Sequence, residues 1–197
     1  MTFYTFARSV VNAIFRPLYR IQAIGAEQFP KEGGVLLCCN HISNFDPIVV
    51  GIMIKRNVYY MAKEELFKMP VFGKIVAMCN AFPVKRGMSD REALRKALKV
   101  LKEGHVLGLF PEGTRSRTGE LGKGLAGAGF FALKSDAAVI PCAIIGPYKS
   151  FRKLKMVYGS PIDMAELRKN KASAEEATEL IMSEIHKLIN EHKEFSA

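Results

Sequence analysis

The sequence predicts an α/β fold, with a single domain built on a mostly parallel, mixed sheet that is flanked by helices. The first observation is a set of short apolar runs typical of buried strands, at 35–39, 58–62, 106–110 and 139–145. The second is that segments with helical periodicity separate these runs. Strands that alternate with helices favour crossover connections, and such connections give a largely parallel sheet.

Two of the expected helices have clear start signals. Ser89 with Glu92, and Ser173 with Glu176, each match a capping box, in which the two side chains bond each other's backbone N–H groups. Apolar residues at helical spacing follow both pairs, and Gly104 supplies a stop signal after the first helix. With 197 residues, of which 49% are hydrophobic and 24% charged, the chain suits one compact domain.

The N-terminal 24 residues are predicted to form an amphipathic helix. At about 100° per residue the polar side chains share an arc of about 120°; they are Thr5, Arg8, Ser9, Asn12, Arg16 and Arg20. The apolar side chains fill the rest of the circumference: Phe3, Phe6, Val10, Val11, Ile14, Phe15 and Leu18. This pattern is typical of a helix that lies among lipid headgroups, although packing on the protein's own core is the alternative. We favour a membrane-associating helix over 1–24 and a separate main domain over 25–197.

No segment is long enough to span a bilayer. The longest charge-free apolar stretches, such as 75–84, fall short of the ~18–20 residues that a spanning helix needs. The arginines within 3–24 and the missing cleavage pattern argue against a secretory signal. Membrane contact is therefore expected to be peripheral or monotopic.

The formal net charge of +10 predicts an anionic partner, which can be nucleic acid, acidic lipid, or a phosphorylated substrate or carrier. No nucleic-acid-binding motif is present, so we expect no nucleic acid partner. The four cysteines have no CxxC spacing, and Cys38 and Cys39 lie inside an apolar run. They indicate a reducing compartment and argue against a metal site.

The segment 40–47, Asn-His-Ile-Ser-Asn-Phe-Asp-Pro, follows the first predicted strand. A histidine acts as a general base near neutral pH, and a carboxylate can orient it and stabilise its protonated form. On a continuous helix His41 and Asp46 would diverge by about 140°, but Pro47 disfavours helix at Asp46, so a turn can bring them together. Each also has a structural alternative, Asp46 as a helix N-cap and His41 as a hydrogen-bonded histidine without catalytic duty.

Two further loops offer groups that suit a phosphate. The segment 110–117, Phe-Pro-Glu-Gly-Thr-Arg-Ser-Arg, and the segment 82–87, Phe-Pro-Val-Lys-Arg-Gly, both end apolar stretches in cations. A solvated surface turn is the alternative for each. The GxGxxG pattern at 122–127 follows a polar loop and not a strand, so it is weak evidence for dinucleotide binding. A GxSxG elbow, which a serine hydrolase would need, is absent.

Together these segments resemble the glycerolipid acyltransferase family, and most of all its bacterial 1-acylglycerol-3-phosphate acyltransferases. The family's HxxxxD block matches 41–46, and its second block matches 81–87, which contains Arg86. The third block matches 110–116 and the fourth matches 139–142. The blocks appear in the family's order, and HxxxxD with FPEGTRS at this separation is highly specific.

The resemblance implies transfer of a fatty acyl group from acyl-CoA or acyl carrier protein to lysophosphatidic acid, which gives phosphatidic acid in phospholipid biosynthesis. His41, oriented by Asp46, would deprotonate the acceptor hydroxyl, with no covalent acyl-enzyme, metal or dissociable cofactor. The glycerol phosphate site would comprise Arg86, Glu112, Gly113, Thr114 and Arg115, and Pro141 would support the acyl pocket. Glu112 would accept a hydrogen bond from a glycerol hydroxyl or position one of the two arginines.

The resemblance also places the acyltransferase catalytic domain in 25–197, on an anionic membrane surface at the cytoplasmic face of the cell membrane. Lys85 stands where the family often has an acidic residue, which adds positive charge at the phosphate site. Apolar positions at Phe67, Met69, Val71 and Phe72 would assist a short N-terminal anchor. Two alternatives stay open: the same chemistry on glycerol 3-phosphate or another lysophospholipid, and a non-catalytic protein that binds anionic lipid.

Overall fold

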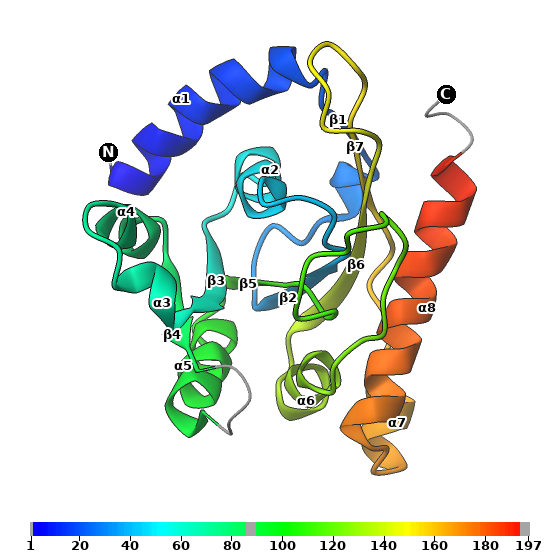
Figure 1. Cartoon of the computed structure of the whole chain (residues 1–197). Coiled ribbons are helices and arrows are strands. Elements are labelled where there is room, and N and C mark those ends of the chain that lie inside the picture. The colour runs from blue at the N-terminus through cyan, green and yellow to red at the C-terminus, as the bar shows by residue number, and fades with distance from the viewer. Residues whose placement is uncertain (1, 86–89, 194–197) are drawn as a thin grey trace.

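The computed structural model describes residues 2–85 and 90–193, and it confirms the predicted α/β fold. Its centre is a sheet of seven strands in the order β1-β7-β6-β2-β5-β3-β4. The five neighbouring strands from β6 to β4 run parallel. At one edge β7 is antiparallel to β6, and β1 pairs with β7 in parallel. Helices lie on both faces of this sheet (Figure 1).

The strands are β1 (Gln22–Ile24), β2 (Val35–Cys39), β3 (Val58–Lys63), β4 (Ala81–Val84), β5 (Val106–Leu109), β6 (Ala138–Ile145) and β7 (Lys155–Tyr158). The α-helices are α1 (Phe3–Leu18), α2 (Asp46–Met53), α3 (Glu64–Phe67), α4 (Phe72–Met78), α5 (Arg91–Lys102), α6 (Gly127–Lys134), α7 (Ala165–Lys169) and α8 (Ala174–Lys193). A single 3-10 turn, η1 (Ala26–Gln28), follows β1 within the described residues.

Strand β2 lies at the centre of the sheet and is buried on both faces. Val35, Leu37 and Cys39 belong to one hydrophobic core together with residues of α2. Leu36 and Cys38 belong to a second core together with residues of α5, α6 and α8. Successive side chains of a strand point to opposite faces, so an unbroken apolar run satisfies both cores.

The connections after β2 and β5 leave the sheet on opposite sides. Helix α2 follows β2 and packs in the first core, whereas α6 follows β5 and packs in the second. The two strands are direct neighbours, with Cys38 opposite Leu109 at their carboxyl ends. A crevice outside the carboxyl ends of the strands is expected wherever neighbouring parallel strands send their connections to opposite faces. The fold therefore opens a site between the loops that follow β2 and β5.

All four predicted strands are present, with boundaries that differ from the prediction by at most one residue. Strands β1, β4 and β7 were not predicted from the sequence. Each is only three or four residues long, which is too short for a periodic pattern to stand out. The first two also pair on one side only, because they form the two edges of the sheet.

The two predicted helix starts have different outcomes. At α8 the Ser173 N–H donates to the Glu176 carboxylate (2.6 Å) and the Glu176 N–H donates to the Ser173 hydroxyl (3.1 Å), which confirms the capping box. Helix α5 is present as predicted, but its predicted cap was wrong, because Asp90 is the N-cap and its carboxylate accepts from the Ala93 N–H at 3.0 Å. An ionised carboxylate is the stronger acceptor at a helix N-terminus. Ser89 itself lies outside the described residues.

Helix α1 uses its two sides differently. Tyr4 is buried and its hydroxyl accepts from the Val58 N–H (3.2 Å), while Arg8 donates to the Lys55 carbonyl (2.7 Å). The opposite side exposes an apolar row with helical spacing: Phe3, Phe6, Val10 and Ile14. In the described ranges 2–85 and 90–193, helices fall short of the length and apolar character that crossing a bilayer requires.

Candidate active site

The residues singled out by the sequence gather at the carboxyl edge of the parallel strands. His41 lies two residues beyond the end of β2, and the loop that begins at Phe110 follows β5 directly. The two rings stack, with centroids 4.3 Å apart and planes inclined by 23°. Two segments that are far apart in the sequence therefore form one site beyond the carboxyl ends of β2 and β5.

His41 and Asp46 form a hydrogen-bonded pair, as the sequence predicted. The distance from His41 Nδ1 to Asp46 Oδ2 is 2.7 Å. Asp46 begins helix α2 with Pro47 as the next residue, and its side chain turns back across the loop. The alternative role of Asp46 as the helix N-cap was wrong, because Phe45 is the N-cap and Asp46 is the first residue of α2, with its carboxylate turned back to the His41 loop.

The Asp46 carboxylate is fully buried and accepts hydrogen bonds at both oxygens. Oδ2 accepts from the backbone N–H groups of Ile42 and Ser43, each at 2.7 Å, in addition to the His41 ring. Oδ1 accepts from the Tyr148 hydroxyl at 2.6 Å. Because an ionised carboxylate only accepts, the ring proton of neutral His41 is assigned to Nδ1. His41 Nε2 is then the nitrogen that can take a proton from a substrate.

The loop after β5 also holds the backbone of His41. The His41 N–H donates to Glu112 Oε1 (2.8 Å), and the His41 carbonyl accepts from the Ser116 N–H (2.8 Å). Together with the Phe110 stack, these contacts fix the histidine on three sides. The His41 side chain keeps 16% of its surface exposed, so it remains accessible to a substrate.

Glu112 joins three segments through main-chain contacts. Its second oxygen, Oε2, accepts from the Gly122 N–H at 2.8 Å. The carboxylate is buried, and within the described residues it forms no ion pair with Arg115. Its contact with a glycerol hydroxyl stays a prediction, and the structure adds a second task for this residue, which is to anchor the His41 loop.

The remaining predicted ligands line the same loop. Gly113 has a φ of 66°, which favours glycine, and its N–H closes a turn onto the Phe110 carbonyl (2.9 Å). Thr114 and Arg115 are exposed beyond this turn. A shallow pocket of about 260 Å³ adjoins them, lined in part by Glu112, Thr114, Ser116 and Lys123. These residues offer hydroxyl and ammonium donors to the pocket.

Of the remaining predicted residues, one lies outside the described residues and one lies within the sheet. Arg86 lies outside the described residues, although strand β4 ends at Val84, on the same carboxyl edge. Pro141 is buried within β6, opposite Cys38 of β2, and its carbonyl accepts from the Gly159 N–H (2.9 Å). Its role as support for an acyl pocket stays a prediction.

Sequence reasoning missed Tyr148, which the structure places on Asp46. It follows β6 by three residues, at the same edge as His41 and Phe110. The rule that singled out the loops after the other two strands therefore applies to it as well. It was overlooked because it belongs to no motif and is separated from Asp46 by 102 positions.

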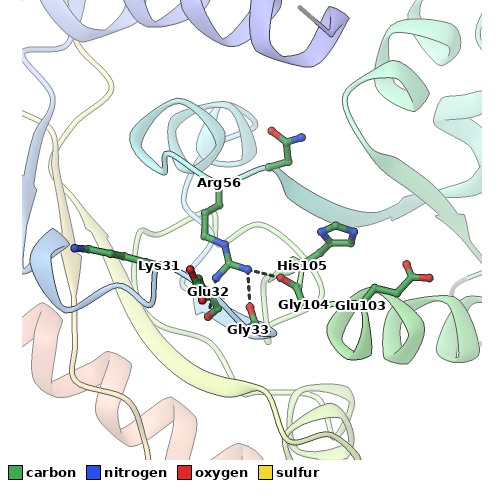
Figure 2. Close-up of a pocket in the computed structure, with 8 residues that line it drawn as sticks. Lys31, Glu32, Gly33, Arg56, Glu103, Gly104 and His105 are labelled. Atoms are coloured by element: carbon green, nitrogen blue, oxygen red, sulfur yellow. Dashed lines mark hydrogen bonds between the residues drawn. The ribbon is translucent and has the colours of Figure 1, made fainter.

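A larger pocket, of about 470 Å³, lies at the opposite edge of the sheet, where its contacts hold neighbouring loops together. Figure 2 shows the Arg56 guanidinium at its centre, donating to the carbonyls of Gly33 and Gly104. The same group donates to the Pro30 carbonyl at 3.0 Å. These contacts use the donors of Arg56 to tie the loop before β2 to the turn before β5. His105 lines this pocket. It lies just before β5, at the opposite end of that strand from the His41 pair, and its ring stacks on Tyr59.

The cysteines do not supply a nucleophile at this site. All four are free thiols, and Cys38, Cys39 and Cys142 are buried in the sheet. Burial raises the pKa of Cys38 and of Cys39 well above the usual thiol range, so both remain protonated. The fold and the site together define an α/β enzyme built around a histidine–aspartate pair.

A family model described as Acyltransferase matches residues 20–145, and the chain belongs to this acyltransferase family. A 1-acyl-sn-glycerol-3-phosphate acyltransferase of Bacillus subtilis (strain 168) is 30% identical over 169 residues, which cover 83% of this chain and 84% of that protein. A protein of the same name from Streptococcus pneumoniae (strain ATCC BAA-255 / R6) is 27% identical over 203 residues, which cover 98% of this chain and 75% of that protein.

A solved structure shares the fold. The crystal structure of the 1-acyl-sn-glycerophosphate (LPA) acyltransferase PlsC from Thermotoga maritima superimposes with a TM-score of 0.65 at 24% sequence identity. The match covers 95% of this chain and 83% of that one.

Proposed function

We propose that this protein transfers a fatty acyl group from an acyl thioester to the free hydroxyl of 1-acyl-glycerol 3-phosphate, giving phosphatidic acid. The observation that carries the proposal is the His41–Asp46 pair at 2.7 Å, held against the loop at 110–116. The names of the two bacterial relatives support lysophosphatidic acid as the acceptor.

In the proposed reaction, His41 Nε2 takes the proton of the acceptor hydroxyl as its oxygen attacks the thioester carbonyl carbon. Asp46 stabilises the imidazolium that forms. The tetrahedral intermediate then collapses, the carbon–sulfur bond breaks, and the thiolate leaves with the proton returned by His41. The products are the ester and a free thiol, and no acyl-enzyme is formed.

Recognition of the acceptor phosphate is assigned to the exposed end of the loop after β5. Thr114 and Arg115 lie there beside the pocket lined by Ser116 and Lys123. An arginine fork matches phosphate oxygens, and hydroxyl groups donate to the remaining ones. Arg86 belongs to the same proposal, by resemblance.

The donor is proposed to be acyl-CoA or acyl carrier protein, and neither a metal nor a dissociable cofactor enters the scheme. Both donors are anionic, and the net charge of +10 suits either one. The thiol released in the reaction is the common readout for both donors.

The membrane is proposed to bind at α1 and α4. The exposed apolar row of α1 includes Phe6 and Ile14, each 56% exposed. Helix α4 and its N-cap present a second row at helical spacing, Val71, Phe72, Ile75 and Met78. Figure 1 shows α4 on the side of the molecule where α1 begins. Apolar rows facing outward, together with positive charge, favour an anionic bilayer surface, here assigned to the cytoplasmic face of the cell membrane.

The decisive experiment incubates purified protein with lysophosphatidic acid and acyl-CoA on anionic vesicles, and in parallel with acyl carrier protein as donor. Thiol release and phosphatidic acid are measured for the wild type and for His41→Ala. Product from the wild type alone establishes the reaction. Glycerol 3-phosphate is offered as a second acceptor, and greater turnover with it would reassign the acceptor. Failure of the wild type with both donors and both acceptors would favour the lipid-binding alternative.

A further inference from the structure

We propose that Tyr148 is a positioning residue for catalysis, which acts by holding the Asp46 carboxylate in the orientation that pairs it with His41. The proposal rests on the proposed function, because it assigns a role in the same reaction. Tyr148 lies beyond residues 20–145, which the family model matches, and outside the blocks that carry the family resemblance.

The two oxygens of Asp46 have unequal support. Oδ2 accepts from three groups: the His41 ring and the backbone N–H groups of Ile42 and Ser43. Oδ1 accepts from the Tyr148 hydroxyl. The terminal torsion of an aspartate is broad, so contacts at one oxygen alone leave the plane of the carboxylate poorly fixed. A donor at the other oxygen fixes that plane, and with it the direction of the bond to His41.

Burial makes this contact matter. Asp46 has no exposed surface, so water cannot replace a lost donor at Oδ1 without a change in packing. A buried carboxylate oxygen that loses its hydrogen bond is still shielded from water. The free-energy cost of that desolvation is then no longer offset. Loss of the Tyr148 hydroxyl would therefore strain the charged group that must stabilise the imidazolium.

Tyr148 is itself held in place from two directions. Its ring meets Tyr19 edge-on at 5.5 Å and lies 6.0 Å from Phe45, the residue before Asp46. The turn before it needs Gly146, which has a φ of 118° and whose added Cβ would lie 2.7 Å from the Lys153 carbonyl oxygen. The hydroxyl is thus aimed by a constrained turn and an aromatic cluster.

The phenol serves as a donor and not as a second base. Burial, followed by the neighbouring charge of Asp46, raises the pKa of Tyr148 well above its ordinary value. The hydroxyl therefore keeps its proton at every pH at which the reaction is measured. Its effect on the reaction passes through Asp46.

The test compares Tyr148→Phe, which keeps the ring and removes the hydroxyl, with the wild type. We expect kcat to fall about tenfold, equivalent to about 1.4 kcal/mol, with KM for both substrates changed less than about twofold. In the Asp46→Asn background the same substitution should cause no further loss in kcat. Tyr158→Phe is the matched control, since Tyr158 is a buried tyrosine whose hydroxyl contacts only Met156 Sδ, at 3.5 Å, among the described hydrogen bonds. This control should retain wild-type kcat.

A second measurement does not depend on turnover. The proton between His41 Nδ1 and Asp46 should give a low-field NMR signal that Asp46→Asn abolishes and that Tyr148→Phe shifts or broadens. An unshifted signal and an unchanged kcat in folded Tyr148→Phe would overturn the proposal. If the wild type has no activity but the signal responds as expected, the positioning contact stands and the proposed function fails.

Discussion

The backbone N–H of His41 donates to the side chain of Glu112, 71 residues further along the chain, at a distance of 2.8 Å. The contact means that the histidine is placed by the loop that follows a different strand. It joins the two blocks of sequence that were recognised separately, 41–46 and 110–116.

Removal of the catalytic pair should abolish most of the activity while the fold is retained. His41→Ala and Asp46→Asn should each lower kcat by about 100- to 10,000-fold, the range for loss of a positioned base. Acyl transfer measured beside a thermal unfolding curve separates the two effects. Near-normal turnover by a folded His41→Ala protein would remove the histidine from the mechanism.

The Glu112 tether should contribute to both stability and turnover. Glu112→Gln keeps one acceptor oxygen but points an NH₂ group at the other backbone N–H. We expect the free energy of unfolding to fall by about 1–3 kcal/mol, the cost of an unsatisfied buried donor, and kcat to fall with it. Chemical denaturation and steady-state kinetics measure the two quantities. Glu179→Gln, an exposed change on α8, is the control and should leave both unchanged.

Arg115 should act on the acceptor and not on the chemical step. Arg115→Ala should raise KM for lysophosphatidic acid by about ten- to a hundredfold, the worth of a hydrogen bond to a charged group. The control Lys169→Ala removes an exposed cation on α7 and should have no such effect. An equal loss in both variants would show that general positive charge, and not this side chain, recognises the phosphate.

The absence of tryptophan from the chain makes the membrane proposal directly measurable. Single substitutions Ile14→Trp on α1 and Val71→Trp before α4 each introduce one reporter. With anionic vesicles containing brominated lipid, both should show quenched, blue-shifted emission, because the ring enters the apolar layer. Glu166→Trp, at an exposed position on α7, should stay unquenched. Quenching of Ile14→Trp alone would confine membrane contact to α1.

The helix caps should make stability depend on pH on the acid side. A hydrogen bond from the Ala93 N–H lowers the pKa of Asp90, and one from the Ser173 N–H lowers the pKa of Glu176. A lowered folded-state pKa gives stability that is present above the unfolded-state values, near 3.8 and 4.5, and is lost as pH falls through the folded-state pKa. Thermal unfolding between about pH 6 and pH 3 should show this loss, and Asp90→Asn and Glu176→Gln should each reduce it.

The sequence was sufficient for the central strands and for the principal pair. β2, β5 and β6 are buried on both faces, so each appears as a continuous apolar run. The contact between His41 and Asp46 was predictable because the two residues are five apart and Pro47 restricts the backbone between them. Local chemistry was enough in both cases.

The contacts that complete the site could not be predicted in this way. Glu112 bonds backbone groups of His41 and Gly122, and backbone groups carry no sequence signal. Tyr148 reaches Asp46 only because β6 lies beside β2 and ends at the same edge of the sheet. Local patterns do not fix which strands become neighbours.

The nature of Glu112's partners has a consequence for how this family is compared. A main-chain N–H is present in every residue except proline, so the partners of Glu112 are free to change identity without loss of the contact. A glutamate in such a role is constrained alone, and no second position needs to change in step with it. Methods that find neighbouring residues through correlated substitutions would therefore miss the link between the two loops, even though it places the histidine.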